Sequence, residues 1–187
     1  VRRKGKERNL VPHSPDVFNL SSLPFAYDAA ATAPLWGKFL DEVLPNAPMD
    51  QAFLQEWFGY LLTGRTNIHK MAVLAGESRS GKGTILRIMR ALLGEENTAA
   101  GRLDDIVEQF GMEPLIGKTL LTFGDVRWNN SNVQGAIQRL LEISGEDAQT
   151  VPRKGKTAWH GTLGARIVFA GNDVPRFNDP SHAMANR

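Results

Sequence analysis

The spacing of apolar residues divides the chain into an amino-terminal helical part and a following part that alternates between strands and helices. Residues 1–32 contain three prolines and no sustained periodicity, which predicts tail and loop. Apolar side chains then recur at helical spacing over residues 35–44 and 48–62. A proline begins each segment and Gly64 follows the second, as is typical of helix ends. We expect these two helices to form a small subdomain over residues 25–66.

From residue 70 onward, short apolar runs alternate with helical patterns. The runs at 71–75, 119–123 and 166–170 predict buried strands. Helices are predicted over residues 84–93, 103–110 and 133–143. This alternation indicates a parallel sheet with helices on its faces. The sequence therefore predicts an α/β fold, with a tail over residues 1–24 and a core domain over residues 67–187.

The composition is that of a globular protein and excludes several kinds of site. The chain has 187 residues, of which 42% are hydrophobic, which suits one domain with an ordinary core. It has no cysteine, which excludes disulfides, thiolate zinc sites and thiol nucleophiles. No apolar run approaches membrane-spanning length, and no signal-peptide pattern is present. We therefore expect a cytoplasmic protein without a membrane partner.

The net charge is only +2, but positive charge is concentrated at the amino terminus. Residues 1–8 carry five basic side chains and one acidic side chain. Such an arm either contacts nucleic acid or links the chain to an upstream domain. Because the chain begins at Val1 and stops abruptly at Arg187, we expect it to be part of a longer polypeptide.

The most informative motif lies between the first predicted strand and the next helix. Gly76 and Gly81 bound a short loop, and Lys82 follows at the start of the helix. Such a loop directs backbone N–H groups and a helix N-terminus at phosphate groups, and its lysine adds a mobile positive charge. The alternative is a glycine-rich turn without a ligand. We expect the ATP phosphates to contact Gly76, Glu77, Ser78, Arg79, Ser80, Gly81, Lys82, Gly83 and Thr84.

Magnesium has two candidate protein ligands. In loops of this kind a Ser or Thr usually follows the lysine and binds Mg²⁺ through its hydroxyl. Here Gly83 follows the lysine, so either Thr84 or a water takes that role. Asp125 comes shortly after the second predicted strand, where an acid can hold Mg²⁺ or its water shell. An acid at a strand end is also common in ordinary turns.

Two further polar residues follow the third predicted strand. Asn172 comes directly after that strand, and its amide is suited to orienting an attacking water. Arg187 stands fifteen residues later, and a guanidinium neutralises charge that develops on a transferred phosphoryl group. Together with Lys82 and Asp125, these residues are the candidates for catalysis. The alternative is again a turn, because Gly-Asn-Asp is typical turn composition.

A basic hairpin is predicted over residues 150–161. Two short extended segments flank a turn centred on Gly155, and the turn is rich in cations. A projection of this kind suits a nucleic-acid backbone, and nearby aromatic rings suit base stacking. The alternative is a solvated turn with no ligand. The candidate DNA-binding residues are Arg153, Lys154, Lys156, Trp159 and His160.

Taken in order, these motifs resemble the superfamily 3 helicases, and more narrowly the helicase module of phage, plasmid and poxvirus-type primase-helicases. The resemblance covers roughly residues 25–187 and is strongest at residues 76–84, 123–127, 143–154 and 171–187. It implies an AAA+-like P-loop NTPase core with three layers, in which ATP and Mg²⁺ bind at the subunit interfaces of a ring, usually a hexamer, around DNA.

The resemblance also implies a role for individual residues. Lys82 and Thr84 match the Walker A lysine and hydroxyl, and Asp125 matches the Walker B acid. Asn172 matches the sensor, and Arg187 matches the arginine finger that acts on the ATP of a neighbouring subunit. The hairpin matches the element that grips single-stranded DNA. The implied function is ATP-driven DNA unwinding or translocation in phage or plasmid replication, as the motor part of a primase-helicase.

This chain departs from the family pattern at one position in the implied site. Many relatives have two acids at the Walker B position, whereas Val126 follows Asp125 here. The general base is therefore Asp125 itself or another carboxylate, with Glu77, Glu146 and Asp147 as candidates. Two alternative functions remain: a nucleotide kinase-like phosphotransferase, since residues 81–84 also resemble nucleoside monophosphate kinases, or a DNA-binding or assembly module that does not hydrolyse ATP.

Overall fold

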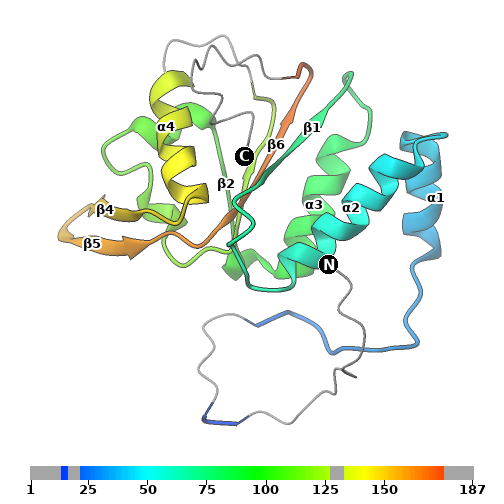
Figure 1. Cartoon of the computed structure of the whole chain (residues 1–187), viewed down its shortest axis with the longest axis horizontal. Helices are drawn as coiled ribbons and strands as arrows, with labels where there is room; N and C mark the ends of the chain where they lie inside the picture. Colours follow the sequence, from blue (N-terminus) through cyan, green and yellow to red (C-terminus); the bar gives the residue numbers. More distant parts are fainter. Residues whose placement is uncertain (1–13, 17–21, 127–132, 175–187) are drawn as a thin grey trace.

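The computed structural model describes residues 14–16, 22–126 and 133–174, which are arranged around a parallel sheet (Figure 1). The sheet contains β1 (Met71–Ala75), β2 (Thr98–Gly101), β3 (Leu120–Phe123) and β6 (Arg166–Gly171). The order across the sheet is β1-β6-β3-β2, and every pair is parallel. The carboxyl ends of all four strands therefore lie at the same edge of the sheet, which is where ligands bind in open α/β sheets.

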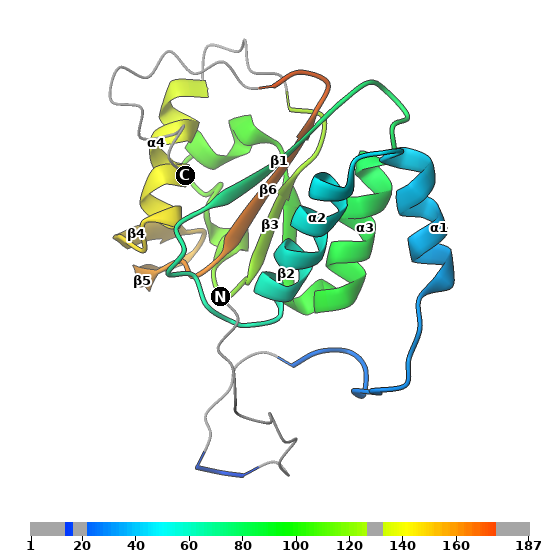
Figure 2. The same ribbon diagram turned by 45° about the vertical axis from the view of Figure 1, so that its right-hand side comes forward.

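Three helices cover one face of the sheet (Figure 2). They are α1 (Pro34–Val43), α2 (Pro48–Leu61) and α3 (Lys82–Leu93). Buried side chains of α2 and α3 form one hydrophobic cluster with Val168 and Ala170 of β6, and aromatic residues of α1 pack against it. The two amino-terminal helices are thus packed on the same layer as the helix that follows the glycine-bounded loop.

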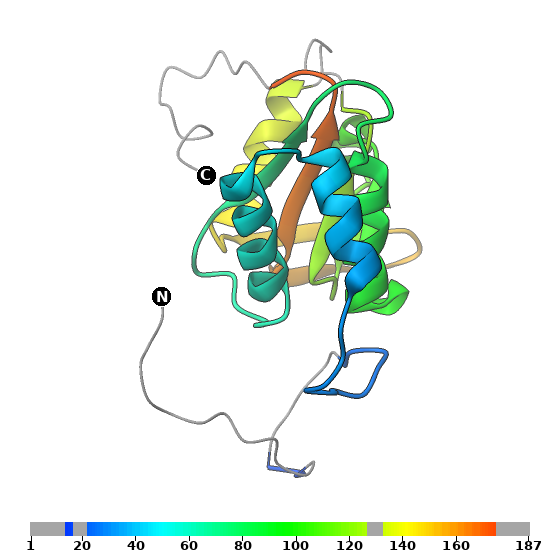
Figure 3. The same cartoon turned by 90° about the vertical axis from the view of Figure 1, so that its right-hand side faces the viewer.

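The other face is covered by one long helix, two short 3₁₀ helices and a hairpin. These elements are η2 (Leu103–Val107), η3 (Glu113–Leu115), α4 (Val133–Ser144), β4 (Ala148–Arg153) and β5 (Lys156–Thr162). In Figure 3 the α1–α3 layer lies nearer the viewer and the β4–β5 hairpin crosses behind the sheet. The molecule is therefore a three-layer α/β/α arrangement with the sheet in the middle.

The central strand β6 shows why an uninterrupted apolar run becomes a buried strand. All six of its residues are buried. Successive side chains point to opposite faces, so that Ile167 and Phe169 join the α4 cluster while Val168 and Ala170 join the α3 cluster. A strand covered on both faces needs apolar residues at every position, which is the pattern of residues 166–170.

Arg166, the first residue of β6, connects the sheet to the end of α2. Its side chain is 2% exposed, and its Nη2 donates a hydrogen bond to the backbone carbonyl of Leu61. Its guanidinium carbon lies 5.8 Å from the centre of the Tyr60 ring. Burial lowers the pKa of Arg166 from its ordinary value, and the nearby phenol of Tyr60 acts in the opposite direction. The cation thus stabilises the negative carboxyl end of α2.

The predicted α/β class with a parallel sheet is confirmed, as are most of the predicted elements. The residues predicted as helix at 103–110 contain the short 3₁₀ helix η2. Strand β2 was not predicted, because Thr98-Ala99-Ala100-Gly101 has neither alternation nor strong strand formers. It is preceded by a 3₁₀ turn, η1 (Glu95–Asn97), and completes the sheet beside β3. Within the described residues, no helix is long and apolar enough to cross a membrane.

Candidate nucleotide site and basic hairpin

A cavity of about 220 Å³ opens at the carboxyl ends of β1, β3 and β6. Three connections meet there: the loop of residues 76–81 (hereafter the glycine loop), the turn after β3 and the turn after β6. Most of the residues predicted to contact phosphates line this cavity together with the predicted acid and amide. Its lining consists of Ser78, Arg79, Ser80, Gly81, Lys82, Gly83, Leu86, Gly124, Asp125, Ala170, Gly171 and Asn172.

The glycine loop ends at Gly81, where the backbone and the packing both require glycine. Gly81 has φ +89° and is the N-cap of α3. A β-carbon at this position would lie 2.8 Å from Val43 Cγ1 and 3.0 Å from Phe39 Cζ. The loop therefore packs directly against α1, and the first N–H groups of α3 face the cavity end of the sheet without partners inside the helix. This arrangement favours an anion at the cavity.

The Lys82 ammonium is bound by the loop that precedes it. Its Nζ donates hydrogen bonds to the backbone carbonyls of Gly76 and Glu77, each at 2.7 Å, and lies 3.2 Å from Ser80 Oγ. An ammonium has three N–H donors, so these contacts use all of them. The lysine thus holds the glycine loop in a closed curve and must exchange some of these contacts to bind a phosphate.

Thr84 is not among the residues that line the cavity in the described part of the chain. Its Oγ1 accepts a hydrogen bond from Arg87 Nη2 at 2.9 Å, one turn further along α3. Consecutive helical residues point about 100° apart, so the hydroxyl at position 84 is turned away from the direction of position 83. The Thr84 hydroxyl is thus hydrogen-bonded within α3 and does not line the cavity.

Asp125 and Asn172 occupy neighbouring turns at the cavity. Asp125 has φ +51°, a left-handed conformation that aspartate tolerates better than most residues. The next residue, Val126, donates its N–H to Ala170 O at 2.9 Å, which fixes the turn beside the end of β6. Asn172 follows Gly171 at the end of β6. A carboxylate and an amide are thereby placed on the same cavity as Lys82.

The carboxylates considered as general base lie in different places. Glu146 Oε1 accepts a hydrogen bond from the Thr66 hydroxyl, and its Oε2 lies 3.5 Å from His69 Nε2. His69 precedes β1, whereas the cavity lies after it, and a five-residue strand spans roughly 16 Å. Glu146 and its neighbour Asp147 are therefore remote from the cavity. Glu77 is exposed on the glycine loop, and Asp125 lines the cavity itself.

The predicted hairpin is present and carries its cations at the turn. Lys154 and Lys156 are exposed on either side of Gly155, and Gly155 has φ +68°. Arg153 is partly engaged within the hairpin, since its Nε donates to Thr157 O at 2.8 Å. The turn is held to the body of the protein by a hydrogen bond from the Lys154 N–H to Glu113 Oε2 at 3.0 Å. Figure 1 shows the hairpin away from the loop between β1 and α3.

The two rings near the hairpin turn are differently placed. Trp159 is partly buried, packs against the α4-side core, and lies over Gly161, where a β-carbon would come within 2.6 Å of it. This packing gives Trp159 a structural role that does not require binding to nucleic acid. His160 is exposed, with its Nδ1 2.9 Å from Thr150 Oγ1 across the strand pair. Of the two, His160 is the ring that is accessible for stacking.

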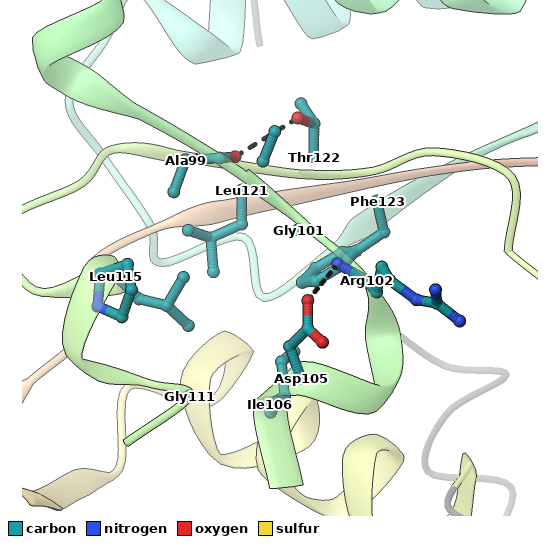
Figure 4. Close-up of a pocket in the computed structure, with 12 residues that line it drawn as sticks. Ala99, Gly101, Arg102, Asp105, Ile106, Gly111, Leu115, Leu121, Thr122 and Phe123 are labelled. Carbon is teal, nitrogen blue, oxygen red and sulfur yellow. Dashed lines mark hydrogen bonds between the residues drawn. The ribbon is translucent and has the colours of Figure 1, made fainter. Parts of the chain in front are cut away.

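A second, smaller hollow of about 150 Å³ lies beside the edge strand β2 (Figure 4). Small residues such as Ala99 and Gly101 leave space there opposite Leu121 and Phe123. Its carboxylate, Asp105, accepts a hydrogen bond from the Arg102 N–H at 3.0 Å and so closes a local turn. The hollow is otherwise mainly apolar, and the predicted site residues are not part of its lining.

One predicted site residue is not placed by the structure, and three residues make contacts that were not predicted. Arg187 lies outside the described residues. Arg87 and Glu113 make contacts to predicted site residues that were not predicted from the sequence, and Arg166, at the end of β6 opposite the cavity, makes an unpredicted contact to α2. Each forms a hydrogen bond: Arg87 with Thr84 within α3, and, with partners that depend on the tertiary fold, Glu113 with the hairpin turn and Arg166 with the end of α2. Only the contact between Arg87 and Thr84 could have been predicted from the sequence, because residues three apart on a helix lie side by side.

Comparison with solved structures shows similarity to the C-terminal region of NrS-1. An apo structure of NrS-1 residues 305–718 matches with a TM-score of 0.63 and 17% sequence identity, over 79% of this chain and 35% of that chain. An A-form apo structure of the same region matches with a TM-score of 0.60 and 18% identity, over the same shares. The chain thus spans about a third of the length of those structures, and at this identity the likeness shows the fold.

No match was found among curated proteins. A family model does match residues 74–187, which is more than half of the chain and includes both the glycine loop and the hairpin. Its description is "Family of unknown function (DUF5906)". On the strength of that match, the chain belongs to the DUF5906 family.

Proposed function

We propose that this chain is an ATP-dependent DNA translocase or helicase with a P-loop NTPase core, which serves replication of a phage or plasmid. The observation that carries the proposal is the common cavity of Lys82, Asp125 and Asn172 at the carboxyl ends of three parallel strands. In P-loop NTPases a triphosphate and its magnesium are held by a glycine-rich loop, by the lysine that follows it, and by an acid at the end of another strand; here these are the glycine loop, Lys82 and Asp125 after β3. The resemblance of the motifs to superfamily 3 helicases supplies the DNA partner.

In this proposal each residue at the cavity has a distinct task. The α3 N-terminus and Lys82 bind the β- and γ-phosphates, because both present positive charge where the phosphates would lie. Asp125 would hold Mg²⁺, which would neutralise charge on the phosphates, and Asn172 would orient the attacking water. The Thr84 hydroxyl is held by Arg87, which leaves Asp125 as the side chain that would hold magnesium. Because Asp125 is the only carboxylate that lines the cavity in the described residues, it is also the favoured general base.

The proposed assembly is a homo-oligomeric ring, the hexamer that the resemblance implies, with Arg187 of one subunit acting on the nucleotide of the next. Hydrolysis would move the β4–β5 hairpin, whose Lys154 and Lys156 contact the phosphates of single-stranded DNA. The nucleotide cavity and the hairpin turn are separated in the fold, which suits a motor that converts chemistry at one place into movement at another.

The direct test is ATP hydrolysis by the full chain with and without single-stranded DNA. We expect hydrolysis that requires Mg²⁺ and rises severalfold with DNA. Asp125→Asn keeps the side-chain shape that the left-handed backbone tolerates but removes the charge, and should lower turnover by roughly 10²–10³-fold with ATP binding retained. Transfer of phosphate to a nucleoside monophosphate would instead identify a phosphotransferase, and ATP binding without turnover would identify an assembly module.

A further inference from the structure

One acidic side chain holds the turn of the hairpin on the body of the protein. The Lys154 N–H donates a hydrogen bond to Glu113 Oε2 at 3.0 Å, across 41 residues of sequence. Glu113 is partly buried, whereas the Lys154 side chain is exposed. The contact therefore fixes the backbone of the turn and leaves the ammonium group of Lys154 directed outward.

The element that carries Glu113 is itself firmly placed. Glu113 is the first residue of η3. Met112 precedes this helix and Leu115 ends it, and these two residues are 5% and 7% exposed and belong to the hydrophobic cluster on the α4 side of the sheet. Leu115 belongs to the same hydrophobic cluster as Leu121 of β3, and both line the hollow in Figure 4, so η3 is part of the layer that covers this face of the sheet. Pro114 further restricts the backbone at this point. The carboxylate of Glu113 thus stands on a part of the core that resists displacement.

The turn on the other side of the contact is less constrained by packing. The β4–β5 pairing has a register shift between Val151 and Arg153. A β-carbon added at Gly155 would meet no other atom within 4 Å, so the turn is open to solvent there. Lys154 and Lys156 lie on either side of that glycine. An anchor at the Lys154 N–H consequently sets the position from which both ammonium groups project.

We propose that Glu113 is a positioning residue for nucleic-acid binding: it holds the hairpin turn in place so that Lys154 and Lys156 are presented together to a phosphate backbone. This inference rests on the proposed function, in which the hairpin binds single-stranded DNA. A turn that is ordered before binding loses less conformational freedom when DNA arrives, which favours the complex. The negative charge of Glu113 acts the other way, since it opposes a polyanion.

These two effects have opposite signs, so paired variants separate them. Glu113→Asp keeps the charge but shortens the side chain by one methylene, which withdraws the acceptor from the Lys154 N–H. Glu113→Gln keeps an oxygen acceptor at the same reach but removes the charge. We expect Glu113→Asp to bind a fluorescent oligo-dT about three- to tenfold more weakly, because the turn must then be ordered when DNA binds; this change in affinity corresponds to about 0.7–1.4 kcal/mol. Glu113→Gln should bind as tightly as wild type or more tightly.

The measurement is a DNA titration of the full chain at several salt concentrations, combined with hydrogen exchange at the Lys154 amide. Glu56→Asp is the matched control, because Glu56 is exposed on α2 in the layer on the other face of the sheet. Exchange at Lys154 should accelerate in Glu113→Asp, stay slow in Glu113→Gln, and be unchanged in the control. Equal melting temperatures exclude a general loss of structure.

Two outcomes would overturn the inference. If Glu113→Asp binds DNA like wild type although its Lys154 amide exchanges faster, the anchor exists but does not position the cations. If Lys154 exchange is unchanged in Glu113→Asp, the anchor is not formed in solution. A wild-type chain with slow Lys154 exchange and no salt-dependent DNA binding would contradict the proposed function itself, which is a different result from either of these.

Discussion

The glycine loop, which is followed by Lys82, and the hairpin turn, which carries Lys154 and Lys156, both place lysine beside glycine in a short connection, yet the structure holds them in different ways. The glycine loop is closed on itself by Lys82 and packs through Gly81 against α1. The hairpin turn exposes Lys154 and Lys156 and is tied to the body through a backbone N–H. In the first connection the cation is part of the structure, whereas in the second the cations are free to meet a partner. This difference separates a loop that is closed on itself beside a cavity from a turn that projects its cations outward.

The largest effect is expected at Lys82, whose ammonium both closes the glycine loop and is proposed to bind phosphate. Lys82→Ala should lower ATP turnover by roughly 10³-fold, because an electrostatic contact to the transferred phosphoryl group is lost. A malachite-green phosphate assay measures this, with Lys38→Ala on the exposed side of α1 as the control. Turnover within a fewfold of wild type would show that the glycine loop is only a turn.

A second effect is expected at Gly81, where the backbone and the packing both exclude a side chain. Gly81→Ala adds a β-carbon 2.8 Å from Val43 Cγ1 at a φ of +89°. Gly117→Ala is a matched control, because Gly117 has φ +76° but has open space around its Cα. Each substitution should lower the free energy of unfolding by about 1–3 kcal/mol through backbone strain.

Only the substitution at Gly81 should also weaken ATP binding, since only it displaces the glycine loop from α1. Isothermal titration with an ATP analogue, paired with chemical denaturation, measures both quantities. Equal ATP affinities in the two variants would mean that the contact between α1 and the glycine loop has no influence on the cavity.

A smaller effect is expected for the cations of the hairpin turn. Replacing both Lys154 and Lys156 by Ala should reduce DNA affinity at every sequence and lower the slope of log K against log salt by about two, one for each lost phosphate contact. ATP turnover without DNA should not change, because the turn lies away from the cavity. Fluorescence anisotropy across a salt series gives the slope, and an unaltered slope would remove the hairpin from the path of the DNA.

The smallest effect concerns Glu146, which ties the root of the hairpin to the segment before β1. The hydrogen bond from Thr66 lowers the pKa of Glu146 from its ordinary value, while desolvation acts in the other direction and His69 adds a further lowering. A lowered pKa in the folded state means that the ionised form contributes stability above the unfolded pKa. That contribution is lost as the pH falls through the lower, folded-state value.

Glu146→Gln should therefore reduce the melting temperature slightly at neutral pH, and the difference from wild type should shrink as the pH falls below the ordinary value of 4.5 toward the lower folded-state pKa. Calorimetry between pH 3.5 and pH 7 measures the trend, and Glu108→Gln provides a control on an exposed side chain. A difference that stays constant over this range would mean that the charge of Glu146 does not contribute.

Much of the fold could be predicted because local pattern and tertiary structure agree over most elements. The apolar run of β6 is buried on both faces, and the prolines and glycines mark the ends of α1, α2 and α3. Strand β2 could not be predicted, because Ala99 and Gly101 have low strand propensity and owe their conformation to the pairing with β3. Its place in the sheet is decided by tertiary contacts.

Part of the cavity lining was predictable from the sequence, but its detailed geometry was not. The rule that ligands lie at the carboxyl ends of parallel strands brought Lys82, Asp125 and Asn172 together correctly as lining of one cavity. The direction of the Thr84 hydroxyl depends on Arg87, and the anchor between Glu113 and the hairpin joins residues far apart in sequence. Such contacts leave no periodic pattern, so they become visible only in three dimensions.

The most direct test of the account is a structure of the full chain with a nonhydrolysable ATP analogue and Mg²⁺. We predict that the Lys82 ammonium leaves the carbonyls of Gly76 and Glu77 and binds phosphate oxygens, with Asp125 at the magnesium or its water shell. A structure in which the analogue binds elsewhere, or in which Lys82 keeps its contacts to the loop while the analogue occupies the cavity, would contradict the account.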